Sequence, residues 1–234
     1  TFTDIAVFDD DSGRLGFAKT LSTPNALVDG IANGIARSDA APADLGLFLH
    51  GSTVAINTML ERTGARTALL VTAGFRDIYE IGRVNRPDAY NLFFQKHEPL
   101  VARADIYEVT ERVFADGAVH TPLDESQVEA VCDQLREGDY EAIAILLLHC
   151  YANNDHERRV REIVEAKLPG VFVSASHELS QEYREFERCS TVVANSYIGP
   201  RVNRYLAGID GRLRGEGFDG SFLVVQSTGG LFEV

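Results

Sequence analysis

The sequence predicts an α/β protein. Two strand patterns come first, at residues 3–8 and 15–19, and helix and strand patterns then alternate to the end of the chain. Strands that alternate with helices are typical of α/β folds with a parallel sheet. With 234 residues and a hydrophobic content of 45%, the chain is long enough to bury one large core or two small ones.

The first elements are a hairpin and a helix. Residues 9–13, Asp-Asp-Asp-Ser-Gly, join the two strands and tolerate the left-handed backbone of a tight turn. Thr23 precedes a helical pattern that extends to about residue 37, and Pro24 suits the first turn of that helix.

The most informative stretch joins a strand directly to a helix. Residues 45–49 are almost all apolar, which predicts a strand buried on both faces. Ser52 or Thr53 can cap the following helix, whose apolar side is expected to comprise Val54, Ile56, Met59 and Leu60. A turn that also carries His50 and Gly51 suits a phosphate or carboxylate ligand. The alternative is a capped turn in which His50 only contacts a neighbouring side chain.

The middle of the chain is less regular. Gly64 ends the preceding helix, and residues 67–71 predict another buried strand. From residue 82 to about residue 121 the periodicity fades, which indicates a long ordered loop or an insertion. Within it, residues 105–114 are expected to form an edge strand.

The alternation of helices and strands then resumes. Helices are predicted at residues 123–137 and 155–167 and from about 180–188 to 214, and strands at residues 141–149, 171–174 and 222–225. Because this second run follows the irregular stretch, we place soft boundaries near residues 80 and 180. They divide the chain into segments 1–80, 81–180 and 181–234.

Composition argues against several classes of protein. The net charge of −13 opposes nonspecific binding to nucleic acid or to an anionic membrane. Cys132, Cys150 and Cys189 are few, odd in number and free of any CxxC pattern, which indicates a reducing compartment. The longest apolar run, residues 142–148, is too short to span a membrane. The sequence therefore predicts a cytoplasmic protein.

A series of short segments, in this order and spacing, resembles the amino-terminal part of the hydantoinase A / 5-oxoprolinase family. The family includes ATP-dependent hydantoinases and related subunits of acetone and acetophenone carboxylases. The segments are Thr-Phe-Thr-Asp at 1–4, His-Gly-Ser-Thr-Val-Ala-Ile-Asn at 50–57, 64–70, Gly-Phe-Arg-Asp at 74–77, 81–83, 111–113, 122–125, 147–149 with Tyr151, Glu-Phe-Glu-Arg at 185–188, and Gln-Ser-Thr-Gly-Gly at 226–230. They are spread over nearly the whole chain.

The resemblance implies a ribonuclease-H-like fold, similar to the sugar kinase, Hsp70 and actin group, in which two such domains hold ATP between them. The chain would then be an amino-terminal domain, incomplete at both ends, with a second α/β unit. Family members usually have Asp-x-Gly-Gly before the first segment and continue far beyond the last one.

The resemblance also implies the site residues. Thr1, Thr3 and Asp4 would lie near the ATP phosphates, with the Asp4 carboxylate near Mg²⁺, whereas the alternative is simply the start of a strand. The amides of Gly51, Ser52 and Thr53 would point into an interdomain cleft, with His50 on its wall as the catalytic residue. Ser227, Gly229 and Gly230 would form a second ligand loop, or else an ordinary turn, and Thr228 stands where the family usually has Asn.

The implied reaction uses ATP and Mg²⁺ to activate an amide or carbonyl group by phosphorylation, for ring-opening hydrolysis of hydantoins or 5-oxoproline. One alternative is a subunit of an ATP-dependent ketone carboxylase that acts on a small ketone. Another is a non-catalytic module that binds a partner or holds an oligomer together. The expected partner is a hydantoinase B-like subunit or domain, in a homo- or hetero-oligomer.

The remaining polar residues give weaker indications. His149 lies at a predicted strand end but is more easily explained as a histidine satisfied by its neighbours, and the other histidines, His97, His120, His156 and His177, show no metal-ligand spacing. Residues 178–188 are rich in Glu and Arg, which favours surface ion pairs or an interdomain salt bridge. Arg83 and Arg86 could bind an anion or lie on the surface. A triad of Ser52 or Thr53 with His50 is rejected because no orienting carboxylate is identifiable.

Overall fold

The structure is a computed structural model that describes residues 2–23, 26–38, 40–84, 88, 90–96 and 98–234. It contains two compact units. Unit 1 comprises residues 1–56 and 201–234, and unit 2 comprises residues 57–200. Thr1, Pro24, Arg86 and His97 of the sequence predictions lie outside the described residues. The three predicted segments, with boundaries near residues 80 and 180, stay a prediction.

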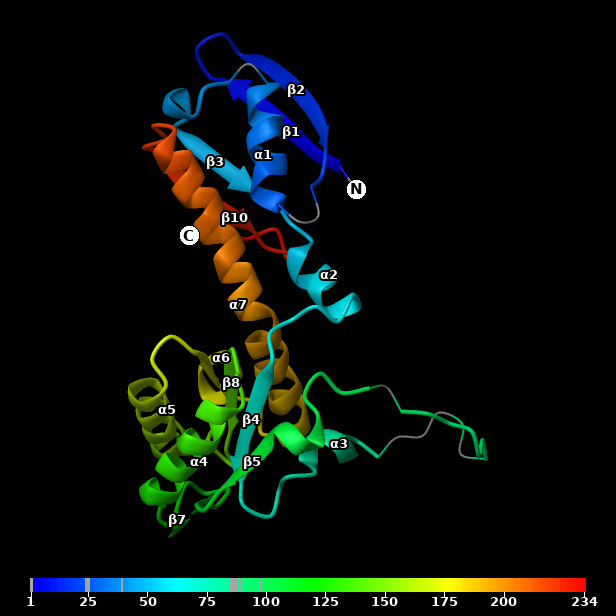
Figure 1. Cartoon of the computed structure of the whole chain (residues 1–234), viewed down its shortest axis with the longest axis vertical. Coiled ribbons are helices and arrows are strands. Elements are labelled where there is room, and N and C mark those ends of the chain that lie inside the picture. The colour runs from blue at the N-terminus through cyan, green and yellow to red at the C-terminus, as the bar shows by residue number, and fades with distance from the viewer. Residues whose placement is uncertain (1, 24–25, 39, 85–87, 89, 97) are drawn as a thin grey trace. The chain divides into compact units, whose positions relative to one another are not determined.

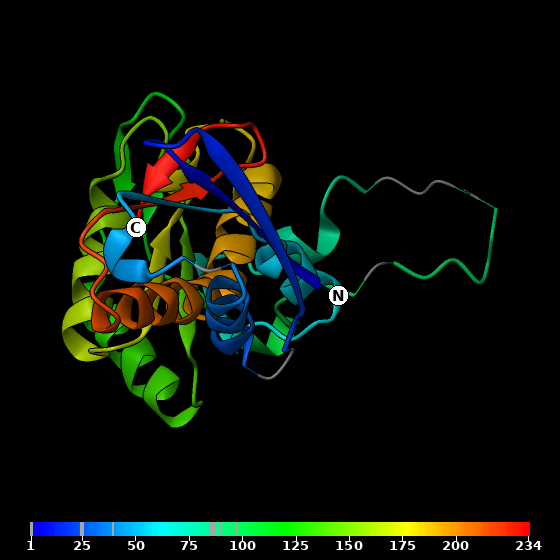
Figure 2. The same ribbon diagram turned by 90° about the horizontal axis from the view of Figure 1, so that it is seen from above.

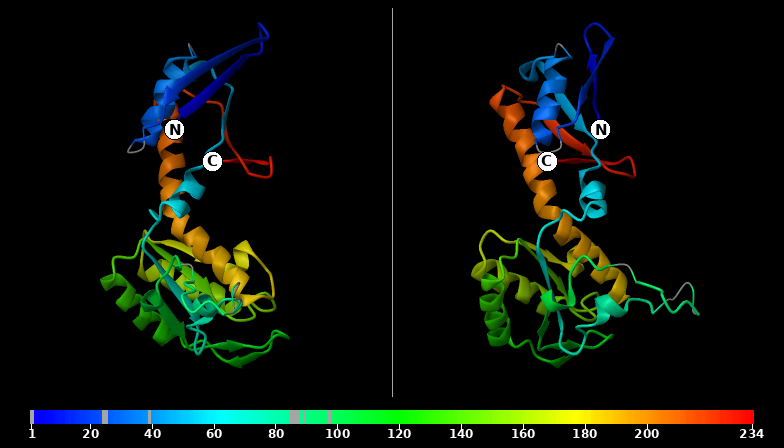
Figure 3. Two further views of the ribbon diagram at one scale, coloured as in Figure 1. Left: turned by 90° about the vertical axis from the view of Figure 1, so that its right-hand side faces the viewer. Right: turned by 45° about the vertical axis from the view of Figure 1, so that its right-hand side comes forward.

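Unit 1 begins with the predicted hairpin. Strands β1 (Phe2–Asp9) and β2 (Arg14–Leu21) pair antiparallel over their whole length. Gly13 in the turn has a φ of 67°, a left-handed conformation that glycine adopts without strain. Helix α1 (Leu27–Ala36) covers one face of the hairpin, and Figures 2 and 3 show the two long strands beside it. The other face of the hairpin is exposed.

The second sheet of unit 1 contains the strand expected at residues 45–49. Strand β3 (Leu47–His50), preceded by the 3₁₀ turn Pro42–Asp44, runs parallel to β10 (Ser221–Val225), which pairs antiparallel with β11 (Leu231–Glu233). Phe48 and Phe222 pack with Ile209 and Leu213 of α7 (Glu185–Gly215). The opposite face is open, because Leu47 and Leu49 are each 51% exposed. The prediction that this strand is buried on both faces was therefore wrong, and β11 was not predicted.

Helix α2 (Val54–Leu60) forms where the sequence predicted a helix, but its apolar side is not buried. Ile56 is 60% exposed and Leu60 is 76% exposed. Thr58 is the buried residue of this helix. The apolar spacing thus identified a helix but not the face that packs.

Unit 2 is built on a four-stranded parallel sheet. Its order is β5 (Ile106–Val109), β4 (Thr67–Thr72), β8 (Ala142–Leu146) and β9 (Phe172–Ala175). Every residue of β4 and β8 is buried, in agreement with the near-continuous apolar patterns of their sequences.

Helices cover both faces of this sheet (Figure 1). Helices α4 (Glu125–Glu137) and α5 (Asp155–Lys167) pack on one face, through Val128, Val131, Val160 and Val164. The first half of α7 packs on the other face through Cys189, Val192 and Val193. Asp124 caps α4, since its carboxylate accepts the Gln127 amide at 3.0 Å.

The stretch from residue 82 to 121 is irregular, as predicted. It follows the short helix α3 (Ile78–Ile81) and contains the 3₁₀ turn Arg103–Asp105, β5, and the small hairpin of β6 (Arg112–Val113) and β7 (Val119–Thr121). β5 is the edge strand expected there. The one-turn helix α6 (Ser176–Leu179) was not predicted.

The α/β prediction is confirmed, with mixed pairing in unit 1 and a parallel sheet in unit 2. Among the described residues, no helix is both long enough and apolar enough to cross a membrane.

Candidate functional site

The turn from β3 to α2 has the predicted local structure. The Ser52 hydroxyl accepts the backbone N–H of Val54, the first residue of α2, at 3.1 Å. Gly51, Ser52 and Thr53 are all exposed. A side chain at Gly51 would meet no atom within 4 Å, and its φ is not in the left-handed range. The turn itself therefore does not require glycine at this position.

His50 is half-buried beneath this turn and is held by aromatic side chains. Its ring lies nearly parallel to that of Phe48, at a centroid distance of 6.2 Å, and its Nε2 atom is 2.9 Å from the Tyr205 hydroxyl. Burial lowers the pKa of His50 and raises that of Tyr205, on which a hydrogen bond with Ser52 acts in the opposite direction. Both side chains are therefore neutral at pH 7, and His50 serves as a hydrogen-bonding group rather than as a cation.

The second predicted loop lies at the same edge of the sheet as His50. β10 is parallel to β3 and places Val224 opposite His50. The loop of residues 226–230 leaves β10 one residue later, and it is closed by bonds from Gln226 N to Gly230 O at 2.8 Å and from Gly229 N to Gln226 O at 2.9 Å. The structure therefore brings the exposed 51–53 turn and the loop that contains Ser227, Gly229 and Gly230 to adjacent strand ends.

The site residues predicted at the start of the chain, Thr3 and Asp4, do not lie on one face of the hairpin. Thr3 and Asp4 are consecutive strand residues and so point to opposite faces of the hairpin. The Thr3 hydroxyl lies 3.3 Å from that of Ser22, whereas Asp4 forms an exposed ion pair with Lys19 at 3.0 Å. That both side chains contact one ligand stays a prediction. In the structure, the two side chains point to opposite faces of the hairpin.

Two of the polar residues that gave weaker indications in the sequence, Arg83 and His149, have hydrogen-bond partners in the structure. Arg83 donates to Glu187 at 2.6 Å. Both residues belong to unit 2, so this ion pair lies within one unit, whereas the salt bridge expected for the charge-rich stretch was an interdomain one. His149 Nδ1 lies 2.8 Å from the Val113 carbonyl oxygen. Among the described residues, no group of three or more His, Cys, Asp or Glu side chains could hold a metal ion.

A buried polar cluster at the carboxyl ends of β8 and β9 was missed by the sequence analysis. The Glu157 carboxylate is fully buried and accepts from Leu147 N at 3.0 Å, Ser176 Oγ at 2.8 Å and His177 N at 2.8 Å. Arg188, also fully buried, donates to the Leu147 carbonyl at 3.1 Å and to Cys150. Burial raises the pKa of the Cys150 thiol to about 12. The thiol is therefore protonated at pH 7 and is no nucleophile there.

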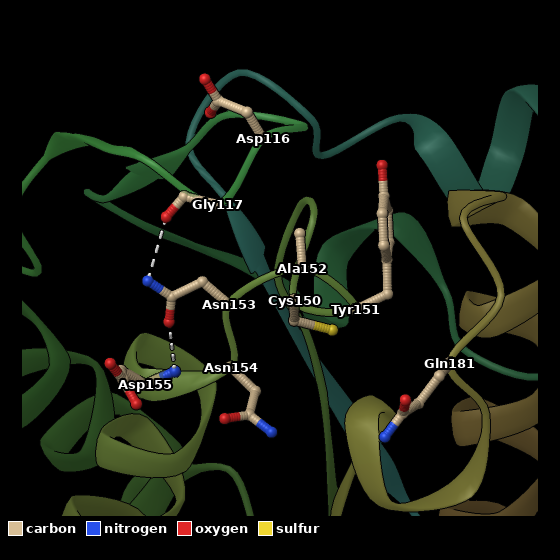
Figure 4. A pocket seen from close by; sticks show the side chains of 9 residues that line it. All are labelled: Asp116, Gly117, Cys150, Tyr151, Ala152, Asn153, Asn154, Asp155 and Gln181. Carbon is tan, nitrogen blue, oxygen red and sulfur yellow. Dashed lines mark hydrogen bonds between the residues drawn. The ribbon is translucent and has the colours of Figure 1, made fainter.

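A pocket of about 410 Å³ opens beside this cluster (Figure 4). It is lined by Asp116 and Gly117 of the β6–β7 turn, by residues 150–155 of the loop after β8, and by Gln181. Its wall is polar.

The 51–53 and 226–230 loops carry hydroxyls and backbone amides but no carboxylate. These groups suit phosphate oxygens. Because the loops offer no carboxylate ligand, they suit Mg²⁺ only if the ion is bound by the phosphates of a nucleotide and by water molecules.

Two protein-family models match the chain. The family model described as the hydantoinase/oxoprolinase N-terminal region matches residues 1–168, and the model described as hydantoinase/oxoprolinase matches residues 188–234. An uncharacterized protein of Methanocaldococcus jannaschii is 38% identical over the whole chain, which covers 35% of that protein.

Two relatives have solved structures. The caprolactamase subunit alpha of Pseudomonas jessenii is 35% identical over 99% of this chain, which covers 34% of that subunit. A crystal structure of ATP-dependent caprolactamase from the same organism matches with a TM-score of 0.85 over 99% of this chain and 35% of the other. A nucleotide-free structure of acetone carboxylase, from work on ATP-dependent acetone carboxylation, matches with a TM-score of 0.85 and 28% identity over the full chain and 36% of the other. The chain thus spans about a third of the length of these relatives.

Proposed function

The chain belongs to the hydantoinase/oxoprolinase family, and from that premise we propose that it is part of an ATP-dependent enzyme that activates an amide by phosphorylation. The amide would be that of a small ring, such as a hydantoin or 5-oxoproline, and hydrolysis would open the ring. The main structural support for the proposal is that two exposed loops, 51–53 and 226–230, lie at the carboxyl ends of the parallel strands β3 and β10. Unit 1 would be part of a ribonuclease-H-like domain.

The loops would bind the phosphates of ATP. Ligands of α/β proteins bind outside the carboxyl ends of parallel strands, where loop amides point away from the sheet. The hydroxyls of Ser52 and Ser227 and the amides of Gly51 and Gly230 would supply donors, whereas the Gly229 N–H already donates to the Gln226 carbonyl oxygen and would shape the loop. Such local donors are needed because a chain with a net charge of −13 repels an anion at long range.

The chemistry follows from the weak reactivity of an amide. Transfer of the γ-phosphoryl group of ATP to the amide oxygen releases ADP and makes the amide carbon more electrophilic. Water then adds to that carbon, and the ring nitrogen leaves as an amine, which opens the ring and gives an acyl phosphate. A second water molecule hydrolyses the acyl phosphate to the carboxylate and free phosphate. The chain's contribution would be to position the phosphates and to stabilise the transferred charge, with Mg²⁺ bound to the phosphates.

His50 would act as a neutral imidazole oriented by Tyr205. Because burial lowers its pKa, its ring can accept or donate a hydrogen bond without adding a charge at pH 7. The Phe48 ring lies nearly parallel to the imidazole on the same face of β3. His50 is therefore proposed to orient a proton or a water molecule near the phosphoryl group.

A ketone carboxylase is the second candidate, because acetone carboxylase has the same fold over the full length of this chain. In that case a carbonyl oxygen would be phosphorylated, and a carbon nucleophile would replace water. Relatives are named as alpha, beta and gamma subunits, which supports the proposal that a hydantoinase B-like subunit or domain is the partner.

The test is ADP release by the full-length protein that contains this chain, with its hydantoinase B-like partner, ATP and Mg²⁺, in the presence of hydantoin, 5-oxoproline, caprolactam or acetone. Stimulation by a cyclic amide supports the amide hydrolase, and stimulation by acetone with bicarbonate supports the carboxylase. If no compound stimulates ADP release, the chain is a binding module and the proposal is wrong.

A further inference from the structure

Tyr205 connects two of the predicted site residues inside unit 1. Its hydroxyl lies 2.9 Å from His50 Nε2, and a hydrogen bond with Ser52 acts on the same hydroxyl. All three residues belong to unit 1, so this connection does not depend on where unit 2 lies. A hydroxyl has one hydrogen, which means that Tyr205 can donate to His50 or to Ser52 but not to both.

The acceptor of the Tyr205 hydrogen follows from the chemistry of its two neighbours. An imidazole nitrogen, whose conjugate acid has a pKa of about 6.5 in an unperturbed histidine, is a far better acceptor than an alcohol oxygen. The Ser52 oxygen also accepts the backbone N–H of Val54 at 3.1 Å. Burial raises the pKa of Tyr205, and the bond with Ser52 acts in the opposite direction, as a bond donated to the phenol oxygen does. Tyr205 therefore donates to His50 Nε2 and accepts from Ser52.

This direction fixes the position of the hydrogen on the neutral His50 ring. A neutral imidazole carries one N–H, and a nitrogen that accepts from Tyr205 cannot carry it, so the hydrogen is on Nδ1. Nδ1 has no hydrogen-bond partner among the residues that the structure describes. It is also not one of their fully buried side-chain atoms without a partner, which are Arg76 Nε, Glu187 Oε2 and Arg188 Nε. The Nδ1–H group is therefore in contact with solvent.

Packing holds the two rings together. Tyr205 belongs to the part of α7 that packs in the core of unit 1, next to Leu206 and Ile209. The centroids of the Tyr205 and His50 rings are 5.5 Å apart, and the buried Phe222 ring lies 6.4 Å from that of His50. The hydrogen bond thus joins side chains whose rings are already positioned by their neighbours.

We propose that Tyr205 is a positioning residue that keeps His50 in its Nδ1–H form, so that His50 acts as a neutral hydrogen-bond donor and not as a base. This inference rests on the proposed function and specifies the role of His50 in it. A neutral donor stabilises an oxygen that gains negative charge during phosphoryl transfer, and it needs no proton transfer to do so. A phosphate that accepts the Ser52 hydrogen would leave the bond from Tyr205 to His50 in place.

The hydrogen on His50 is located by ¹⁵N NMR of the full-length protein that contains this chain, labelled at histidine and sedimented for magic-angle spinning. A ring nitrogen with a hydrogen has a chemical shift distinct from that of a ring nitrogen without one, and His50→Gln identifies the His50 signals by their loss. At pH 7 we expect a protonated Nδ1 and an unprotonated Nε2. In Tyr205→Phe, which keeps the packed ring, the Nε2–H form that an unrestrained imidazole prefers should become the larger fraction.

The kinetic readout is substrate-stimulated ADP release by the same full-length protein with its partner. Tyr205→Phe should lower kcat about five- to tenfold, the effect of one lost hydrogen bond, while KM for ATP stays within about twofold. The matched control is Tyr197→Phe, which removes the other tyrosine hydroxyl of α7 and belongs to unit 2. This control should change neither the His50 signals nor kcat.

Three results would overturn the inference. They are a hydrogen on His50 Nε2 in the wild-type protein, His50 signals in Tyr205→Phe that equal those of the wild-type protein, and an unchanged kcat in Tyr205→Phe. The NMR measurement needs neither ATP nor turnover, so its result is separate from that of the ADP-release test. If no compound stimulated ADP release, the proposed function would fail, and the NMR measurement would still decide whether Tyr205 sets the position of the His50 hydrogen.

Discussion

Replacing Glu157 with Gln tests whether the buried cluster holds the loop after β8. The two side chains have the same shape, but a carboxamide has one acceptor oxygen where the carboxylate has two. In the structure, one Glu157 oxygen accepts from Leu147 N and Ser176 Oγ, and the other accepts from His177 N and, at 2.6 Å, from His177 Nδ1. Whichever way the Gln side chain turns, its NH₂ group faces one backbone N–H that cannot accept.

The magnitude follows from these contacts. One unsatisfied buried N–H costs about 1–3 kcal/mol, and the other hydrogen bonds lose the strengthening that a charge provides. The neutral side chain also leaves Arg188 buried without the nearby negative charge. Glu157→Gln should therefore lower the free energy of unfolding by about 3 kcal/mol, which corresponds to a fall in Tm of roughly 6–12 °C for a chain of this size.

The assay is urea unfolding followed by circular dichroism, at pH 7. The control is Glu162→Gln on the same helix, an exposed residue whose ion pair with Arg159 at 2.9 Å contributes at most about 1 kcal/mol. If Glu157→Gln unfolds within about 0.5 kcal/mol of the wild-type protein, the carboxylate is not the centre of the cluster and the reasoning fails.

Three further changes have defined outcomes. Gly64→Ala places a Cβ 2.2 Å from the Tyr197 ring, so it should destabilise the chain by about 1–3 kcal/mol in urea unfolding, and less when Tyr197→Leu is also present. Burial lowers the pKa of His50 in the folded state, so this histidine is protonated more readily in the unfolded state as the pH falls. The free energy of unfolding should therefore decrease as the pH drops below about 6.5, the pKa of an unperturbed histidine. A His50→Gln variant should lose less stability over that range, and equal losses would contradict the assignment. His50→Ala should lower ADP release while costing only about 1 kcal/mol of stability, unlike the exposed His120→Ala, which should change neither.

Much of the fold could be predicted because local pattern and burial agree in unit 2. Residues 68–71 and 142–148 are apolar without alternation, and the structure buries β4 and β8 completely. The helix expected at residues 155–167 has the bounds of α5, because the apolar residues Val160, Ile163 and Val164 recur at helical spacing and are buried.

Unit 1 shows where pattern alone fails. The apolar residues of β3 and α2 indicated burial, but Leu49 and Ile56 are more than half exposed. Apolar spacing shows which residues share a face, whereas the neighbour that covers the face lies elsewhere in the sequence. The two-sided burial predicted for β3 was wrong for this reason.

The same distinction applies to the candidate sites. The His50–Thr53 turn and the 226–230 loop could be named from local residue types and the resemblance, and strand pairing then placed them together. Tyr205, the partner of His50, is 155 positions away and lies inside a long helix, so no local signal marked it. Glu157 looked like an ordinary acidic residue in the first turn of a helix, and only the fold shows that it is buried.

The most direct test of the central claim is substrate-stimulated ADP release by Gly51→Val, with the hydantoinase B-like partner present. A side chain at Gly51 meets nothing within 4 Å and requires no change of backbone, so the variant should keep the Tm of the wild-type protein. It would, however, cover the amides that are proposed to bind phosphate. The control is Gly46→Val at the other end of β3, where a Cβ also meets nothing within 4 Å. The account predicts loss of ADP release in Gly51→Val alone; undiminished ADP release in this variant, at unchanged Tm, would contradict it.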